Sequence, residues 1–262
     1  MNKNYFLIVI LFFLISCTPK ERNVLWCTQG DCQELREIKQ SKAKENNQKQ
    51  LYIVVVIDVF RAFSTAAYVL DRSPASYIFS KNTTTIVKIA SQHEQPLLIG
   101  KPEIGANLIY HIPNSPTRSL QTEVTGKNVL HRTEAGAKGV LLAKDADIVL
   151  VTSFVNSGAT ARYIRKFPKA KVIIMPMGHE GNTPTLEDNL CGQYIVALIN
   201  GKLFDIQQFL PELKQGSGKY FFGNDQWQYP STDFHLCLDI NRFNFPICAY
   251  VKDDYAILAR CD

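Results

Sequence analysis

Several features are missing from this 262-residue sequence, and each absence excludes a class of protein. Beyond an apolar run at residues 5–15, no segment is long and apolar enough to cross a bilayer, which excludes a multi-span membrane protein. The basic stretch 39–50 contains no aromatic residue that could stack on bases, so we do not expect a nucleic-acid-binding protein. No two cysteines have the Cys-x-x-Cys spacing of a structural zinc site, and no internal repeat is visible.

The N-terminus predicts export. The apolar run 5–15 follows Lys3, is too short for a comfortable membrane span of ~20 residues, and fits a secretory signal. It ends in Leu14-Ile15-Ser16-Cys17, which resembles the lipobox of bacterial lipoproteins, where the cysteine is diacylated and becomes the mature N-terminus. The alternative is a signal anchor that stays uncut. Because more than one acyl chain anchors a protein stably, the resemblance implies a lipid-anchored protein of the cell envelope that faces the periplasm or the exterior.

The full sequence has an ordinary globular composition, with 46% hydrophobic and 20% charged residues and a mild formal net charge of +5. We expect three parts: a lipoprotein signal peptide over 1–17, a solvated tether over 18–50, and one α/β domain over 51–262.

The cysteines suggest disulfides without assigning all of them. If Cys17 carries lipid, six cysteines remain. Cys27 and Cys32 enclose only four residues, and an exported protein meets oxidising conditions, so a small disulfide loop is plausible there. One further pair can form among Cys237, Cys248 and Cys261, but their spacing does not say which.

From residue 51 onward, short β-branched or apolar runs alternate with helical patterns. This alternation predicts a layered α/β/α fold, with a largely parallel or mixed central sheet covered on both faces. The expected strands are 51–57, 96–100, 127–132, 147–154 and 171–177, and the expected helices are 61–70, 83–92, 134–146, 156–167 and 186–201. The runs 243–252 and 255–260 look like a closing antiparallel strand pair.

Polar clusters follow the expected strands, where ligands collect in such sheets. We expect them along one edge of the sheet: Asp58, the turn Asn114-Ser115-Pro116-Thr117, His131-Arg132-Thr133, Ser153 with Asn156, His179-Glu180, and Glu187-Asp188.

The first cluster has two interpretations. Asp58 at a strand end can hold a metal through oxygen, and Arg61 beside it can bind phosphate or sulfonate. Ser64 and Thr65, at the start of a helix, can add donors to an anion. The alternative is structural: Asp58 caps the helix and pairs with Arg61.

Each of the other clusters, taken alone, also has both a functional and a structural interpretation. Glu187 and Asp188 suit the first turn of any helix, although the long polar loop before them favours a site that binds Mg²⁺ through one or two carboxylates. The Asn114-Ser115 turn can be an ordinary turn, and Arg132 can be either a positive wall for an anion or the end of a strand. Cys191 is expected to be a buried thiol rather than a nucleophile.

Together and in this order, the motifs resemble the 2-phosphosulfolactate phosphatase (ComB-like) family, magnesium-dependent enzymes of coenzyme M biosynthesis and their bacterial relatives. The resemblance covers about 51–260. It is carried by five matched groups: Asp58, Val59, Arg61, Ala62, Ser64 and Thr65; Asn114, Ser115 and Pro116; Arg132, Thr133, Gly136 and Gly139; Ser153, Phe154 and Asn156; Glu187, Asp188 and Cys191.

The resemblance implies roles for these residues. Asp58, Glu187 and Asp188 would hold or orient Mg²⁺, and together with Arg61, Arg132 and Asn156 they form the expected catalytic set. Ser64, Thr65, Asn114, Ser115, Thr133 and Ser153 would bind the substrate. The expected activity is hydrolysis of a small, acidic organic phosphomonoester. The oligomeric state is left open, a homo-oligomer included.

Two departures from the family pattern bear on the activity. Lys101 and Pro102 follow Gly100, where the family usually has Glu and Arg; Glu103 is a conceivable substitute. A lipoprotein also faces away from the cytoplasm, where coenzyme precursors are made, so phosphosulfolactate itself is not carried over as the substrate. The rival hypothesis is a catalytically impaired envelope lipoprotein that binds an anionic ligand or a protein partner. A different hydrolase chemistry in the same pocket is a third.

Overall fold

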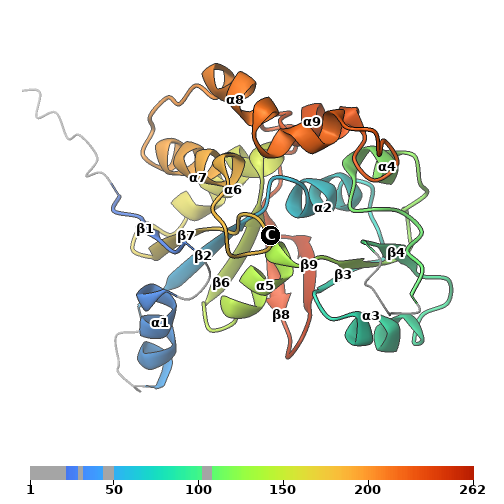
Figure 1. Ribbon diagram of the computed structural model, residues 1–262. Coiled ribbons are helices and arrows are strands. Elements are labelled where there is room, and N and C mark those ends of the chain that lie inside the picture. The colour runs from blue at the N-terminus through green and yellow to red at the C-terminus, as the bar shows by residue number, and fades with distance from the viewer. Residues whose placement is uncertain (1–21, 29–31, 44–49, 102–107) are drawn as a thin grey trace, which may run out of the picture.

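The computed structural model describes residues 22–28, 32–43, 50–101 and 108–262 as a nine-stranded mixed sheet surrounded by helices (Figure 1). The strands are β1 (Leu25–Trp26), β2 (Tyr52–Ile57), β3 (Ser76–Ser80), β4 (Leu97–Ile99), β5 (Asn128–Arg132), β6 (Ile148–Thr152), β7 (Lys171–Pro176), β8 (Ile247–Val251) and β9 (Ala256–Arg260). The α-helices are α1 (Gln33–Ala43), α2 (Ala62–Leu70), α3 (Thr83–Ala90), α4 (Pro116–Leu120), α5 (Ala135–Leu142), α6 (Ser157–Arg165), α7 (Leu186–Ile199), α8 (Leu210–Gln215) and α9 (Ser231–Cys237). Short 3₁₀ turns are η1 (Phe154–Asn156), η2 (Gln207–Phe209) and η3 (Ser217–Phe222). In this described part, no helix has the length and apolar character that a bilayer crossing requires.

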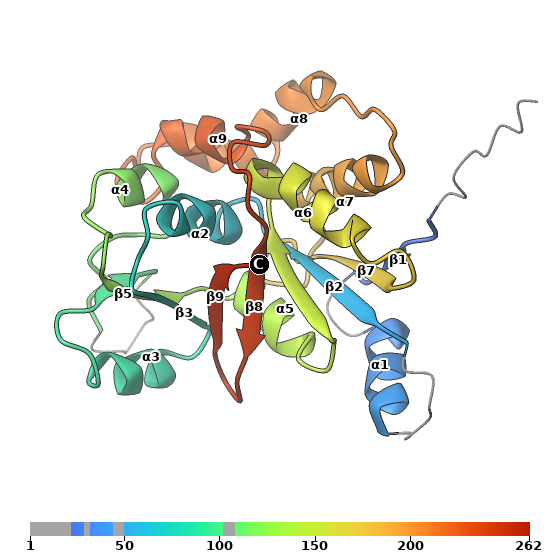
Figure 2. The same ribbon diagram turned by 180° about the vertical axis from the view of Figure 1, so that it is seen from behind.

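The sheet consists of two parallel groups of strands. The strand order is β1-β7-β2-β6-β8-β9-β3-β5-β4. We call β1, β7, β2 and β6 the first strand group and β3, β5 and β4 the second strand group; neighbours within each group are parallel. The antiparallel hairpin β8–β9 lies between the groups and pairs with β6 on one side and β3 on the other (Figures 1 and 2).

The two groups run in opposite directions along the sheet. The neighbouring pairs β6–β8, β8–β9 and β9–β3 are all antiparallel, and three successive reversals turn β3 against β6. The expectation of one common edge for all polar clusters is therefore wrong. The hairpin is the last part of the chain, and nothing in its sequence indicates that it inserts in the middle of the sheet.

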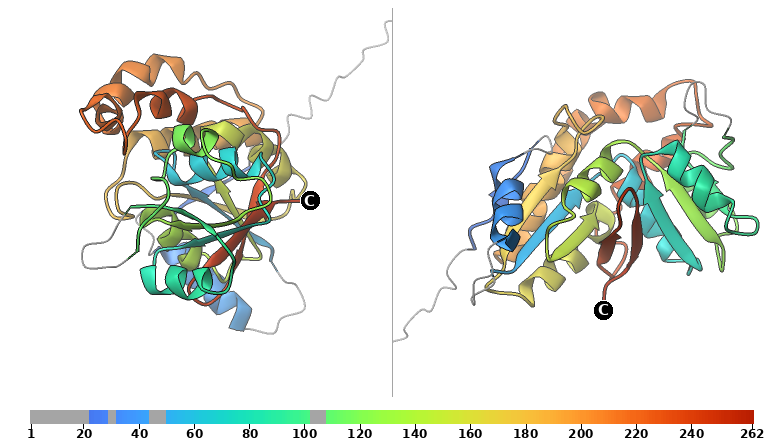
Figure 3. Two further views of the ribbon diagram at one scale, coloured as in Figure 1. Left: turned by 90° about the vertical axis from the view of Figure 1, so that its right-hand side faces the viewer. Right: turned by 90° about the horizontal axis from the view of Figure 1, so that it is seen from below.

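The core explains why the central strand is so apolar. β2 is buried on both faces: Val54 and Val56 pack in one hydrophobic cluster, while Ile53, Val55 and Ile57 pack in another. Helices α2, α4, α6, α7, α8 and α9 lie on one side of the sheet and α1, α3 and α5 on the other (Figures 1 and 3). A strand covered on both faces loses the alternation of polar and apolar residues, which is what its sequence shows.

The layered fold, the mixed and mostly parallel sheet and the C-terminal antiparallel pair are confirmed. Each of the ten predicted helices and strands after residue 51 has its counterpart within a few residues. Six helices and strands were not expected: β3, whose five residues follow α2 closely, β1 and α1 within the predicted tether, α4 at the predicted turn, and α8 and α9 in the segment after residue 202 that was expected to form loops. β1 pairs with β7 and so extends the sheet by a short edge strand.

Two disulfides join the ends of the chain to the sheet. Cys27 bonds Cys32 as expected, and Cys248 bonds Cys261 within the β8–β9 hairpin, which resolves the pairing that the sequence left open. Cys191 and Cys237 are buried free thiols. Residues 1–17, with the predicted lipid site Cys17, lie outside the described residues, as does Glu103.

Candidate functional site

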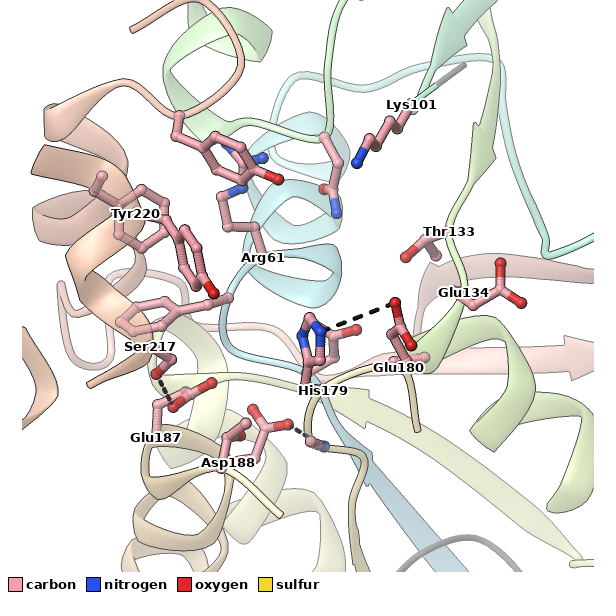
Figure 4. A pocket seen from close by; sticks show the side chains of 18 of the residues that line it. Arg61, Lys101, Thr133, Glu134, His179, Glu180, Glu187, Asp188, Ser217 and Tyr220 are labelled. Atoms are coloured by element: carbon pink, nitrogen blue, oxygen red, sulfur yellow. Dashed lines mark hydrogen bonds and ion pairs between the residues drawn. The ribbon is translucent and has the colours of Figure 1, made fainter. Parts of the chain in front are cut away.

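A cavity of about 670 Å³ lies where the ends of β2, β7 and β5 meet the loops that follow them (Figure 4). Of the predicted site residues, it brings together Asp58, Arg61, Asn114, Arg132, Thr133, Glu187 and Asp188. Its lining also contains Lys101, His179, Glu180 and several residues of 216–229. The twist of the sheet thus turns ends of opposed strand groups toward one space.

Asp58 is the first residue after β2 and is only 7% exposed. Its Oδ1 accepts a hydrogen bond from the backbone N–H of Ala62, the first residue of α2, over 3.0 Å. Burial raises the pKa of Asp58 to about 6, and the charge of Glu187 adds to this shift. Asp58 therefore caps the start of α2, as the structural interpretation of this cluster predicts. It does not form the ion pair with Arg61 that the same interpretation predicts, because Arg61 pairs with Asp233.

Gly136 in α5 permits the close approach of this helix to Asp58. A Cβ at Gly136 would lie 3.0 Å from Asp58 Oδ2, whereas a Cβ at Gly139 would lie 2.3 Å from Met177 Sδ and 2.6 Å from Val56 Cγ1. The helix that follows the second strand group therefore packs directly against the end of the first one.

Glu187 and Asp188 open α7 and lie close to Asp58. Asp188 accepts backbone hydrogen bonds of 2.8 Å from Val59 N, after β2, and 2.8 Å from Gly178 N, after β7, so its carboxylate ties two strand ends together. Burial, then the charges of Glu187 and Asp58, raise the pKa of Asp188 well above its usual value. Burial also raises the pKa of Glu187, against a hydrogen bond from Ser217. Three mutually repelling carboxylates are thus concentrated on one side of the cavity.

Arg61 faces these acids from another wall (Figure 4). One guanidinium nitrogen, Nη1, donates to Asp233 Oδ2 over 2.7 Å and to the carbonyl oxygen of Gln228 over 2.7 Å. The guanidinium also lies over the ring of Tyr229, with Cζ 4.7 Å from the ring centre. Among the described residues, Nε and Nη2 make no hydrogen bond, so they remain able to bind an anion.

The second strand group contributes cationic and neutral polar residues. Arg132 and Thr133 follow β5, and Arg132 forms an ion pair of 3.0 Å with Glu134, which also lines the cavity. Lys101 follows β4, and Asn114 precedes α4 with its buried Oδ1 unpaired among the described residues. This side of the cavity therefore complements the carboxylates in charge.

Five predicted site residues do not line the cavity. Ser64 donates to the carbonyl oxygen of Val59 over 2.8 Å, and Thr65 is buried in α2. Ser153 and Asn156 are buried just after β6, where Asn156 Oδ1 accepts hydrogen bonds from Thr152 Oγ1 and Ser153 N. Ser115 Oγ donates to Asp233 Oδ1 over 2.9 Å. In this structure these side chains support the walls of the cavity rather than face it.

One whole wall of the cavity was not predicted from the sequence. Ser217, Lys219, Tyr220, Phe221, Gln228 and Tyr229 line the cavity, and the buried Asp233 stands behind Arg61. We call residues 217–237 the cover segment. In the sequence it is two polar, Gly-containing loops, and no pattern there marks Asp233 as a partner of a residue 172 positions earlier.

The donor atoms suit Mg²⁺ only in part. Among the residues that the structure describes, no three or more His, Cys, Asp or Glu side chains are arranged to hold a metal ion. Magnesium, however, is commonly bound by one or two carboxylates together with substrate phosphate and water. The buried acids Asp58, Glu187 and Asp188 offer such a partial set.

The fold and the cavity define a class: an α/β protein with a small polar site in which buried carboxylates face guanidinium groups at strand ends. The family model described as 2-phosphosulpholactate phosphatase matches residues 37–216. The chain therefore belongs to this phosphatase family.

Individual proteins similar to this chain carry the name of the same family. A protein of Bacillus subtilis (strain 168) named probable 2-phosphosulfolactate phosphatase is 25% identical over 189 residues, which are 71% of this chain and 81% of that protein. Proteins with the same name from Caldicellulosiruptor saccharolyticus and Thermoplasma volcanium are 28% and 22% identical over 69% and 76% of this chain, and these matches cover 76% and 88% of the relatives.

Proposed function

We propose that this protein is a Mg²⁺-dependent phosphatase that hydrolyses a small, acidic organic phosphomonoester of the 2-phosphosulfolactate type. The observation that carries this proposal is the meeting of three buried carboxylates and the open edge of Arg61 in one cavity of about 670 Å³. Membership of the phosphatase family supports the reaction class. The names of the relatives support the substrate type.

Asp58, Glu187 and Asp188 would hold Mg²⁺ in this proposal. When bound, the ion would polarise a phosphoryl oxygen and lower the pKa of bound water. The carboxylate of Asp188 is already held in place, because each of its oxygens accepts a hydrogen bond from a backbone N–H group. Fixed carboxylates of this kind keep their geometry while the charge of the substrate changes.

Arg61 and Arg132 would neutralise the phosphoryl group and the second acidic group of the substrate. Guanidinium groups suit this role because they bind phosphate and carboxylate oxygens through paired N–H donors. Asn114 and Thr133 would orient the substrate through hydrogen bonds from the same side of the cavity. Phosphoryl transfer depends chiefly on such positioning and charge stabilisation.

The test is release of inorganic phosphate by the purified protein from a panel of small acidic phosphomonoesters, measured once in Mg²⁺ and once in excess EDTA. We expect turnover in Mg²⁺ and none in EDTA. A protein that shows no turnover on any member of the panel in Mg²⁺ contradicts the proposed activity.

We further propose that lipid at Cys17 anchors the protein to the cell envelope. The support is the apolar run 5–15 and the lipobox-like sequence before Cys17. In a bacterial host fed with labelled palmitate, the wild-type protein should incorporate the label, and Cys17→Ser should not. Equal labelling of both proteins would contradict the role of Cys17.

A second candidate function follows from Lys101, which lines the cavity at the position where the family usually has glutamate. An added positive charge favours retention of an anion, so the protein can be a binding protein without turnover. This alternative predicts that inorganic phosphate raises the melting temperature while no phosphomonoester is hydrolysed.

A further inference from the structure

The cover segment makes a contact with the cavity that the family match does not include. Asp233 lies beyond the matched residues 37–216 and is completely buried in α9. Its Oδ2 accepts from Arg61 Nη1 over 2.7 Å, and its side chain has no exposed surface. A buried carboxylate bound to a cavity-lining arginine restricts where that guanidinium can point.

Asp233 is itself held in place from the opposite side. Its Oδ1 accepts from Ser115 Oγ over 2.9 Å and from Thr117 N over 2.8 Å. Ser115 and Thr117 belong to the start of α4, the turn that the sequence assigns to substrate binding. Both carboxylate oxygens of Asp233 are therefore used, one on α4 and one on Arg61.

The remaining contacts of Arg61 leave one edge for a ligand. The carbonyl oxygen of Gln228 accepts a hydrogen bond from Arg61 Nη1. The ring centres of Tyr229 and Phe221 lie 4.7 and 5.6 Å from Arg61 Cζ. Among the described residues Nε and Nη2 have no hydrogen-bond partner, and Arg61 lines the cavity. Without Asp233, a long flexible side chain could adopt several rotamers and lose part of its affinity for an anion.

We propose that Asp233 is a positioning residue for anion binding by Arg61, and that Ser115 and Thr117 at the start of α4 act on the substrate through Asp233. This proposal rests on the proposed function only in taking Arg61 as an anion ligand. Asp233 touches no substrate. It fixes the guanidinium so that Nε and Nη2 face the cavity before the anion arrives, which lowers the entropic cost of binding.

The decisive experiment measures binding of inorganic phosphate by calorimetry and, separately, steady-state hydrolysis, for Asp233→Asn, Arg61→Gln and the double variant. Asparagine keeps the shape of the side chain and can still accept from Thr117 N. We expect Asp233→Asn to weaken phosphate binding and to raise KM by about 10- to 100-fold, with a smaller change in kcat. In the Arg61→Gln background the same substitution should have no further effect, because the residue through which it acts is gone.

Two more variants keep the test sharp. Thr232→Ala is the matched control, since it removes the contact between Thr232 Oγ1 and Thr117 Oγ1 at the same α4–α9 interface, and it should leave phosphate binding within twofold. Ser115→Ala removes one bond to Asp233 and should weaken phosphate binding in the same direction by a smaller factor. If Asp233→Asn does not fold, phosphate binding by Ser115→Ala tests the positioning role in its place.

The outcomes separate this proposal from the proposed function. Phosphate binding that depends on Asp233 only when Arg61 is present supports the positioning role, even if no ester is hydrolysed. Unchanged binding in Asp233→Asn, or equal losses in the wild-type and Arg61→Gln backgrounds, overturns it. A wild-type protein that binds no phosphate overturns it as well.

Discussion

The two strand groups of the sheet contribute opposite charges to the same cavity. The first strand group and its loops provide Asp58, Glu187 and Asp188, all nearly buried, whereas the second strand group provides Lys101 and Arg132. Two of the acids accept backbone hydrogen bonds, Asp58 from Ala62 and Asp188 from Val59 and Gly178, whereas Glu187 accepts one from the side chain of Ser217. Arg132 is held by the side chain of a neighbour, Glu134, and by the backbone carbonyl oxygen of Lys81.

Under the proposed function, this difference assigns separate tasks to the two sides of the cavity. Groups that hold a metal need fixed geometry, and backbone donors at the ends of buried strands supply it. Groups that receive a substrate need to adapt, and side chains near solvent can do so. Arg61 is the exception, since it follows β2 but is fixed from the cover segment through Asp233.

The largest expected effect is on activity, and it distinguishes the residues of the first strand group from those of the second. Asp58→Asn should lower kcat/KM by about 100- to 1,000-fold, because it removes a carboxylate from the acidic side. Arg132→Gln should act mainly on KM, by about tenfold. Both are measured as phosphate release from the best substrate of the panel in Mg²⁺.

Asp71→Asn, at the other end of α2, is the matched control for Asp58→Asn and should keep full activity. Full activity in Asp58→Asn would refute the role of the acidic side.

The hairpin between the groups is the next place to test. Replacing Cys248 and Cys261 by serine opens a loop with a sequence separation of 13, and should lower the free energy of unfolding by about 3 kcal/mol. The separation for Cys27 and Cys32 is 5, and the same change there should cost about 2 kcal/mol. Urea unfolding of both double variants measures the two values. A greater loss at Cys27 and Cys32 would contradict the expectation that the longer loop gives the larger stabilisation.

A pH effect belongs to the second strand group. Burial, then the charge of Arg61, lower the pKa of His131 to about 3, and His131 Nδ1 lies 2.7 Å from Tyr77 Oη. Because the unfolded chain binds this proton near pH 6.5 and the native protein does not, the contribution is present above pH 6.5 and is lost as the pH falls toward 3. Between pH 7 and 5 it should amount to about 2 kcal/mol.

Urea unfolding at the two pH values, compared between the wild type and each variant, measures the contribution of His131, because the opposite effect of the raised pKa of Asp58 is present in all of them. His131→Gln should reduce the difference between the two pH values, whereas His235→Gln, at an exposed histidine, should keep it. An unchanged pH dependence in His131→Gln would contradict the assignment.

The smallest effect concerns α5, which joins the two groups. Gly136→Ala places a methyl group 3.0 Å from Asp58 Oδ2, and 3.1 and 3.3 Å from the buried rings of Phe63 and Phe79, and should lower kcat by about tenfold with a smaller loss of stability than Gly139→Ala. Gly139→Ala, on the same helix, meets Met177 and Val56 and should instead lower stability by about 1–3 kcal/mol. If both variants lose stability but keep the kcat of the wild type, α5 does not control the position of Asp58.

Much of the fold could be predicted because its elements are marked locally. β2 is a continuous run of mostly β-branched residues, and α7 is a long, largely apolar helical segment that ends before Gly201. The position of the β8–β9 hairpin could not be predicted, because strand neighbours depend on packing between distant segments. For the same reason the sequence predicts a single sheet edge where the structure has two opposed groups.

The candidate site was predictable where one residue both follows a strand and carries a charge, as Asp58 and Arg132 do. Ser115 and Asn156 have the right chemistry in the right motifs, yet their side chains point into supporting networks. Asp233 had no local signal at all, since its importance arises from a contact with Arg61 across 172 positions of sequence.

The most direct test of the account is diffraction from crystals grown with Mn²⁺, a substitute for Mg²⁺ with a strong anomalous signal, together with inorganic phosphate. The account predicts one Mn²⁺ peak beside Asp58 and the Glu187-Asp188 pair, with the phosphate between this ion and Arg61. A peak away from these carboxylates, or a phosphate without contact to Arg61, would contradict it.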